Sequence, residues 1–231
     1  MTQGSITNIT RYPVKSMRGE SLETVDVDFV GLPLDRAFGF VQDGLLSPFP
    51  WFTGRECPQL LQCQPVLRGE GRWPEVRVST PEGDFDLASP EFREQLFAWS
   101  GRHATLRSDY RGCQDVAYAS VISTATIRAL TEPSGVPFDQ RRFRMNFVVE
   151  LGDEPFAENA WVGKQITLGG VTLAVHQPDQ RCNMITLDPE TGTSTPAVLK
   201  KAGELNEACA GVYCSVLVEG KVSIGDEVRC P

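Results

Sequence analysis

The stretch "KQITLGGVTLAVH" (Lys164–His176) decides the fold class, because it has the pattern of two short strands joined by a tight turn. Apolar and polar residues alternate on both sides of the Gly169-Gly170 pair, and a period of two is typical of half-buried strands. Two adjacent glycines supply the positive φ angles that two-residue hairpin turns require. The stretch therefore predicts a β-hairpin.

Similar alternating runs extend from this hairpin in both directions along the chain: "SITNITRYP", "ETVDVDFV", "AFGFVQ", "EVRVST", "RFRMNFVVEL" and "GVYCSVLVEGKVSIGDEVRC". Within the last run, "VEGKVSIGDEV" predicts a second hairpin-like meander near the C-terminus. So many short strands indicate a β-barrel or a β-sandwich core.

Three segments interrupt the strand pattern with helix signals. "SPEFREQLFAW" carries Ser89 as its N-cap and Pro90 at the first helical position, "STATIRAL" begins at Ser123, and "TPAVLKKAGEL" begins at Thr195. The predicted fold class is mainly β (α+β), with a few peripheral helices.

Length and charge narrow the class of protein. A chain of 231 residues buries one sizeable core or two small ones, and the softest division lies in "DYRGCQDVA", which suggests domains at 1–112 and 113–231. The net charge of -8 disfavours binding to nucleic acid or to an anionic membrane. We find no secretory or transit signal and no apolar run long enough to span a bilayer, so we expect a cytoplasmic protein.

The sequence lacks the motifs of several common catalytic and nucleotide-binding sites. His103 and His176 are the only histidines, and no GxSxG, HExxH, GxxxxGK[ST] or GxGxxG motif is present. The seven cysteines are an odd number without CxxC spacing, which argues against a zinc ribbon, a thioredoxin motif or a built-in iron–sulfur cluster. We expect the cysteines other than Cys182 to be buried, reduced thiols.

Two basic turns have the composition of a phosphate site. In "RYPVKSMRGE", Lys15 and Ser16 offer an ammonium and a hydroxyl just after a strand, and in "LPLDRAFGF", Arg36 offers a guanidinium beside Asp35. Each segment is also compatible with a solvated turn or a structural ion pair. A third basic segment, "QRRFRMNFVVEL", predicts a strand that carries Arg142, Arg144 and Asn146 on one face, which suits either a polar pocket or an exposed sheet surface.

Cys182 stands beside Arg181 in "QPDQRCNMITLDPETG", after an apolar strand-like run. A thiolate is the form that attacks electrophiles or binds soft metals, and neighbouring cations favour that form. The spacing alone leaves three interpretations open: a metal ligand, a nucleophile assisted by His176, or a buried structural thiol.

Taken together, these segments resemble the MOSC family, named after the C-terminal domain of molybdenum cofactor sulfurase. "YPVKS", "DRAF" and "TGRECPQL" are similar to the N-terminal β-barrel region that accompanies MOSC domains. "FRMN", "PFAENAWVGKQITLG", "RCNMITLDPETG", "GVYCSV" and "VSIGDEV" are similar to the MOSC domain itself. The resemblance, closest in layout to the YcbX and mitochondrial amidoxime-reducing component types, implies an N-terminal barrel-like domain packed on a C-terminal MOSC barrel.

The resemblance also implies a molybdenum-molybdopterin cofactor and its binding residues. It makes Cys182 the protein ligand of the metal, with Arg181 and Asp188 supporting the metal loop. It implies that the remaining residues bind the phosphate or the ring of the pterin, or lie near them: Lys15, Ser16, Arg36, Thr53, Arg55, Ser123, Arg144 and Asn146. Asp179 stands where many relatives carry a cysteine or a small residue, and Met145 stands where proline is common.

The function implied by the resemblance is reduction of N-hydroxylated compounds, with Asp179 or Asp188 relaying protons. Electrons would come from a separate flavin or iron–sulfur reductase, since we expect no iron–sulfur cluster and no pyridoxal phosphate in this chain. Two alternatives stay open: a sulfur carrier or cofactor-handling protein that uses Cys182 as a persulfide or cofactor anchor, and a binding module with an empty site.

Overall fold

A closed β-barrel combines the first strand with strands from the C-terminal half of the chain in a computed structural model that describes residues 2–69, 71 and 73–230. Within these residues seven strands close the barrel, because the first strand pairs with both ends of the row. In spatial order they are β11 (Phe147–Glu150), β10 (Ala119–Ser123), β14 (Cys209–Val218), β13 (Val171–Gln180), β12 (Gln165–Leu168), β16 (Glu227–Cys230) and β1 (Thr2–Arg11). The predicted mainly β fold class is confirmed.

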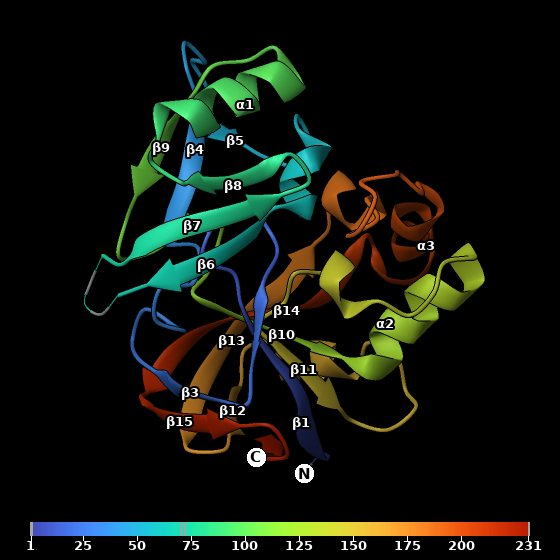
Figure 1. Cartoon of the computed structure of the whole chain (residues 1–231). Coiled ribbons are helices and arrows are strands. Elements are labelled where there is room, and N and C mark those ends of the chain that lie inside the picture. Colours follow the sequence, from blue (N-terminus) through green and yellow to red (C-terminus); the bar gives the residue numbers. More distant parts are fainter. Residues whose placement is uncertain (1, 70, 72, 231) are drawn as a thin grey trace.

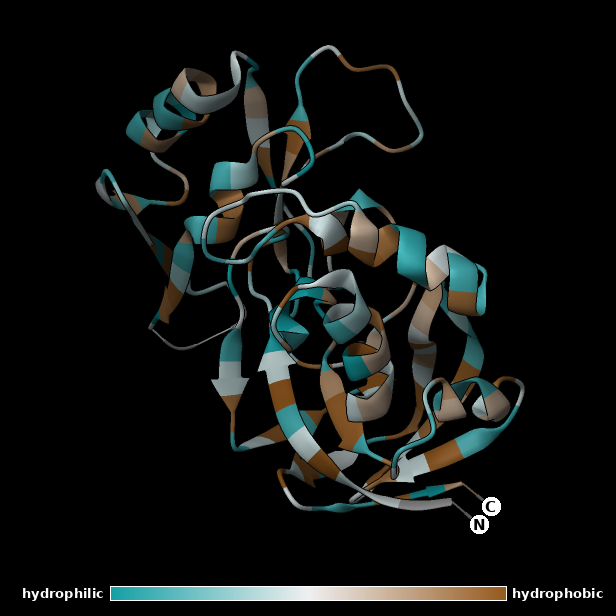
Figure 2. Ribbon diagram, turned by 90° about the vertical axis from the view of Figure 1, so that its right-hand side faces the viewer, coloured by the Kyte–Doolittle hydropathy of each residue, from teal (hydrophilic) through white to brown (hydrophobic). Residues whose placement is uncertain are grey.

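The Gly169-Gly170 hairpin is confirmed as the turn between β12 and β13. Leu168 pairs with Val171, and Gly169 has a φ of 53°, as a two-residue hairpin turn requires. Apolar side chains from the barrel strands fill the interior, among them Ile166, Leu168 and Leu173. Figure 2 shows this pattern as brown and teal residues that alternate along the strands.

Apart from β2, the strands outside the barrel make three smaller sheets. β2 (Glu20–Leu22) extends the barrel sheet beside β1, and β3 (Thr24–Val27) pairs with β15 (Gly220–Ser223). The N-terminal part adds a sheet of β5 (Trp51–Phe52), β4 (Phe38–Gln42) and β9 (Ala104–Ser108), and another of β6 (Gln64–Arg68), β7 (Glu75–Thr80) and β8 (Gly83–Asp86). Figure 1 shows these two sheets above the barrel.

Two sequence predictions about strands are wrong. The predicted C-terminal hairpin is absent from the described chain, because β15 pairs with β3 whereas β16 pairs with β1 and β12. The predicted strand over 140–151 is shorter, because 140–142 form a 3-10 turn and Arg144 has a φ of 55°. Arg142, Arg144 and Asn146 therefore do not share a strand face, since tertiary contacts of both arginines override the local alternation.

The three predicted helices are confirmed in the part of the chain that the structure describes: α1 (Pro90–Ser100), α2 (Thr124–Thr131) and α3 (Ala197–Asn206). The Ser89 side chain accepts a hydrogen bond from the Phe92 amide at 3.2 Å, which caps α1, and Pro90 opens the helix. α2 and α3 cover one side of the barrel (Figure 1) over a core that includes Ile127, Leu130 and Val198.

The chain crosses between the two parts more than once. β1 and β2 precede residue 112 yet pair in the barrel sheet, so the N-terminal strands build both parts of the molecule. The division at 112/113 stays a prediction. Among the described residues, no helix combines the length and apolar character needed to cross a membrane.

Candidate functional site

A cavity of about 220 Å³ lies where segments of the N-terminal part meet the ends of barrel strands. Five cationic side chains line it against two carboxylates, so the lining is positive in a chain whose net charge is -8. The cations are Lys15, Arg36, Arg55, Arg144 and Arg181, and the carboxylates are Asp115 and Asp179. A local excess of cations in an acidic protein is the arrangement expected of an anion site.

Two of the arginines pack against the same aromatic ring, that of Tyr12. The guanidinium carbons of Arg36 and Arg144 lie 4.6 Å and 4.4 Å from the centroid of the Tyr12 ring. Arg36 donates to the backbone oxygen of Arg144 at 2.6 Å, and Arg144 donates to the Met17 oxygen at 2.8 Å. Burial lowers the pKa of Arg144 to about 10; the charge of Arg36 adds to this shift, and the ionisable Tyr12 hydroxyl opposes it. Arg36 already pairs with the buried Asp35, and an anion bound near Arg144 would offset the repulsion between the two arginines.

The backbone is strained at the same place. Ser16, Arg36 and Arg144 have φ angles of 68°, 50° and 55°, which non-glycine residues rarely adopt. They make up three of the seven non-glycine residues with positive φ in the described chain, and all three line the cavity. Each such residue costs about 1–3 kcal/mol, and strain of this kind clusters at functional sites.

Lys15 is buried and already has partners. Its Nζ donates to the Cys113 oxygen at 2.9 Å and to the Asp115 carboxylate, and it lies 5.4 Å from the Trp51 ring centroid. Burial lowers the pKa of Lys15, although the Asp115 carboxylate opposes that shift. An incoming anion therefore competes with Asp115 for the ammonium group.

Cys182 lies at the edge of the cavity, on the turn that follows β13. It precedes a 3-10 segment, Asn183–Thr186, and it is the one exposed cysteine within the described residues. Five of the other cysteines are buried, as the sequence predicted, whereas Cys209 departs from the prediction because it is half-buried. His176 hydrogen-bonds Ser215 at 2.6 Å and is not part of the cavity lining, so the predicted alternative of a Cys182-His176 pair gains no support.

Asp179 and Arg181 form a buried ion pair beside Cys182. Arg181 also donates to the Phe143 oxygen, while its Nε has no partner among the described residues. Burial raises the pKa of Asp179 despite the charge of Arg181, and the Tyr213 hydroxyl hydrogen-bonds the same carboxylate. The site thus holds a carboxyl group that retains a proton more readily than an exposed aspartate does.

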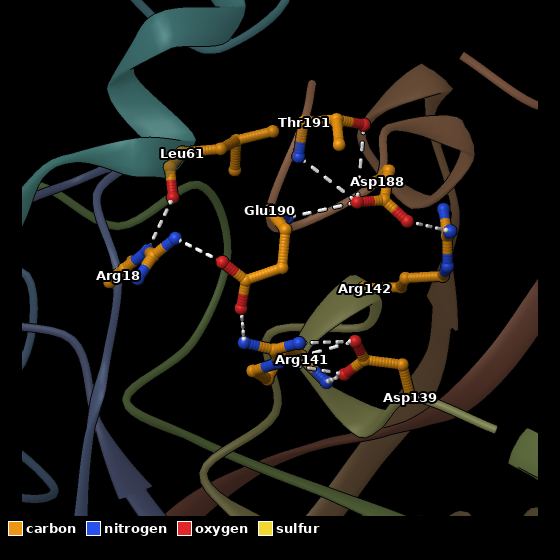
Figure 3. A network of polar contacts seen from close by, with 8 residues as sticks. All are labelled: Arg18, Leu61, Asp139, Arg141, Arg142, Asp188, Glu190 and Thr191. Carbon is orange, nitrogen blue, oxygen red and sulfur yellow. Dashed lines mark hydrogen bonds and ion pairs between the residues drawn. The ribbon is translucent and has the colours of Figure 1, made fainter. Parts of the chain in front are cut away.

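Asp188 lies outside the cavity lining, in a network that ties the segment after Cys182 to the rest of the protein (Figure 3). Its carboxylate accepts from the buried Arg142 at 2.7 Å and from the Glu190 and Thr191 amides at 3.0 Å. Glu190 in turn pairs with Arg18 and Arg141 (Figure 3). Burial alone would raise the pKa of Asp188, but these amides and Arg142 lower it.

Of the remaining predicted residues, three line the cavity and one, Ser123, does not. The cavity lining includes Thr53, Arg55 and Asn146; Thr53 donates to Glu56 at 2.7 Å and accepts from Arg55 at 3.1 Å. The Asn146 amide bridges Ser120 and the Thr10 oxygen at 3.0 and 3.2 Å. Ser123 does not line the cavity, because it is fully buried as the N-cap of α2 and accepts from the Thr126 amide at 3.1 Å.

Sequence reasoning missed several residues of the lining, among them Gln114, Asp115 and Tyr213. Gln114 and Asp115 lie in "DYRGCQDVA", which we interpreted only as a domain boundary. Tyr213 lies in "GVYCSV", where a single aromatic residue in a strand has no pattern that separates it from core residues.

Two family models together match almost the whole chain. The MOSC domain matches residues 109–229, and the MOSC N-terminal beta barrel domain matches residues 3–109. The chain belongs to the MOSC family. MOSC domains are associated with handling of the molybdenum cofactor.

Individual relatives agree with the MOSC assignment. The chain is 30% identical over 97 residues to the molybdenum cofactor sulfurase of Drosophila pseudoobscura pseudoobscura, and 30% identical over 117 residues to that of Drosophila grimshawi. These matches cover 41% and 47% of this MOSC protein but only 12% and 14% of the sulfurases. This MOSC protein therefore spans only a small part of the length of the sulfurases. The YUAD protein from Bacillus subtilis shares its fold, with a TM-score of 0.53, 15% identity and coverage of 98% and 94% of the two chains.

Proposed function

We propose that this MOSC protein is a molybdenum-cofactor-dependent oxidoreductase that reduces N-hydroxylated compounds with electrons from a separate flavin or iron–sulfur reductase. The observation that carries the proposal is a cationic, strained cavity with the exposed Cys182 thiol at its edge. A thiolate binds molybdenum through Sγ, because soft sulfur ligands suit such metals. The cavity residues fit the organic part of the cofactor, since it is anionic and the lining is cationic.

Two of the protein's arginines are already positioned to hold the cofactor, whereas Lys15 must first change its partner. Arg36 and Arg144 are fixed by the Tyr12 ring and by backbone oxygens, so their donors already have defined directions. Lys15 adds an ammonium group once it exchanges Asp115 for an anionic oxygen of the cofactor. Preorganised cations of this kind bind phosphate more tightly than mobile surface lysines because less side-chain entropy is lost.

When bound, the cofactor supplies the two electrons that break the N–O bond. The overall reaction converts R–NH–OH, two electrons and two protons into R–NH₂ and water. Asp179 is suited to deliver a proton, because burial raises its pKa and Arg181 occupies Oδ2, which leaves Oδ1 to carry the proton. The Tyr213 hydroxyl orients this carboxyl group. Asp188 is less suited, because Arg142 and two amides occupy its oxygens outside the cavity lining.

The test is reduction of benzamidoxime by molybdenum-loaded protein with an artificial electron donor. We expect benzamidine as the product, and we expect Asp179→Asn to lower kcat while the molybdenum content stays constant. Absence of turnover by a fully molybdenum-loaded sample contradicts the proposal.

A second candidate is a sulfur carrier in which Cys182 bears a persulfide. Two observations favour it: Cys182 is exposed, and the relatives named above are molybdenum cofactor sulfurases. Intact-mass spectrometry separates the candidates, because a stable added sulfur on Cys182 in metal-free protein supports the carrier.

A further inference from the structure

Gln114 presents an amide group that nothing in the described protein satisfies. Both its Oε1 and its Nε2 are buried from solvent and lack a hydrogen-bond partner, although the residue belongs to the cavity lining. Buried amides are almost always paired, so an amide with neither its acceptor nor its donors in use requires an explanation. A ligand bound in the cavity would explain the unpaired amide, because it would supply the missing hydrogen-bond partners.

The amide is held by a fixed segment rather than by a loose loop. The Cys113 amide donates to the Arg36 oxygen at 2.6 Å, and Lys15 donates to the Cys113 oxygen at 2.9 Å. Gly112 has a φ of +87°, and a Cβ there would lie 3.0 Å from Gln114 Nε2. Glycine at 112 therefore allows both the turn and the position of the amide.

Cations are the most numerous charged groups in the cavity lining. Lysine and arginine donate hydrogen bonds but accept none, so the five cations offer nothing to an N–H group of a ligand. Each carboxylate already uses one oxygen to accept from a cation, Asp115 Oδ1 from Lys15 and Asp179 Oδ2 from Arg181. The Asn146 oxygen accepts from Ser120 at 3.0 Å. Gln114 thus adds an unpaired acceptor and an unpaired donor, side by side, to this lining.

We propose that Gln114 recognises a ligand edge that carries an N–H donor beside a C=O or nitrogen acceptor, as in a lactam or an amidine. A primary amide forms two parallel hydrogen bonds with such an edge, which adds selection by shape to the charge recognition of the arginines. The inference rests on the proposed function, under which two ligands present this edge. One is the pyrimidinone ring of the pterin, and the other is the N-hydroxylated amidine substrate.

The test compares wild type with Gln114→Met, which keeps the length of the side chain and removes both unpaired polar groups. Gln165→Met, at an exposed position on β12, is the matched control. The first readout is equilibrium binding of metal-free molybdopterin to the apo-protein. The second is the Tm of the apo-protein, and the third is KM for benzamidoxime with loaded protein.

We expect Gln114→Met to bind metal-free molybdopterin about tenfold more weakly, or about 1.4 kcal/mol, and its apo-protein to melt about 2–4 °C higher because the unpaired groups are gone. Unchanged molybdopterin affinity with a raised KM assigns the edge to the substrate, which also supports the inference. Unchanged molybdopterin affinity together with an unchanged KM overturns the inference. A lower Tm together with weaker binding also overturns it, because that result gives Gln114 a structural role. A wild-type protein that does not bind molybdopterin contradicts the proposed function as well.

Discussion

Replacing Asp188 by alanine tests whether the network of Figure 3 fixes the segment that follows Cys182. The side chain of Arg142 is 2% exposed, and Asp188 supplies its charged partner at 2.7 Å. Without Asp188 the guanidinium keeps one hydrogen bond of 3.3 Å, to the Thr186 oxygen, and its Nε has no partner within the described chain. The substitution therefore leaves a buried cation without a counter-ion.

The expected cost follows from these contacts. Breaking a buried ion pair typically costs about 3–5 kcal/mol. Asp188 is 29% exposed, so water replaces part of the interaction and lowers that contribution to about 2 kcal/mol. Loss of the hydrogen bonds from the Glu190 and Thr191 amides adds about 1 kcal/mol. We expect Asp188→Ala to lower the free energy of unfolding by about 3 kcal/mol.

Urea denaturation at neutral pH measures this difference. The double variant Arg142→Met/Asp188→Ala should recover more than about 1 kcal/mol of the loss, because an apolar side chain has no charge to satisfy. Glu204→Ala, which removes exposed ion pairs with Lys200 and Lys201, is the control and should leave the midpoint unchanged. A loss below about 1 kcal/mol in Asp188→Ala, or a double variant less stable than the single one, refutes the reasoning.

Three further predictions concern the cavity and its supports. Asp115→Asn removes the competitor for Lys15, so metal-free molybdopterin should bind up to about fivefold more tightly in equilibrium dialysis; weaker binding contradicts this. The hydrogen bond and charge of Arg141, together with Arg18, lower the pKa of Glu190. Glu190 therefore stabilises the folded protein above its unfolded-state pKa, and this stabilisation is lost as the pH falls. The stability advantage of wild type over Glu190→Gln should therefore shrink between about pH 6 and about pH 3 in urea titrations, and a constant difference argues against it. Ser123→Ala should cost about 1 kcal/mol as a lost helix cap while molybdopterin affinity stays unchanged, whereas lost affinity would restore Ser123 to the cofactor site.

Local signals in the sequence were sufficient where one short segment determines its own structure. The Gly169-Gly170 turn and the Ser89-Pro90 helix start needed only neighbouring residues, and both are confirmed. The failure at 140–146 has a tertiary cause, because Arg142 bonds to Asp188 and Arg144 stacks on Tyr12, both distant in sequence. No alternation pattern contains those contacts.

The candidate site was accessible mainly through the family resemblance. Lys15, Arg36, Arg144 and Cys182 are separated by long stretches of chain, and their local sequence alone left a solvated turn, an ion pair, an exposed sheet face or a structural thiol open as alternatives. The structure brings ten of the twelve predicted site residues to one cavity and leaves Ser123 and Asp188 outside its lining. Gln114 had no sequence signal, because its unpaired amide is visible only once the surrounding chain is in place.

Molybdenum content tests the central claim most directly. Wild type, Cys182→Ala and the control Cys209→Ala are purified from a host that makes the cofactor, and metal is measured by elemental analysis. Cys209 is the half-buried thiol outside the cavity lining, so its loss should not affect the metal. The account predicts near-stoichiometric molybdenum in wild type and Cys209→Ala, and its loss in Cys182→Ala. Equal molybdenum in all three proteins, or none in wild type despite proven cofactor supply, would contradict it.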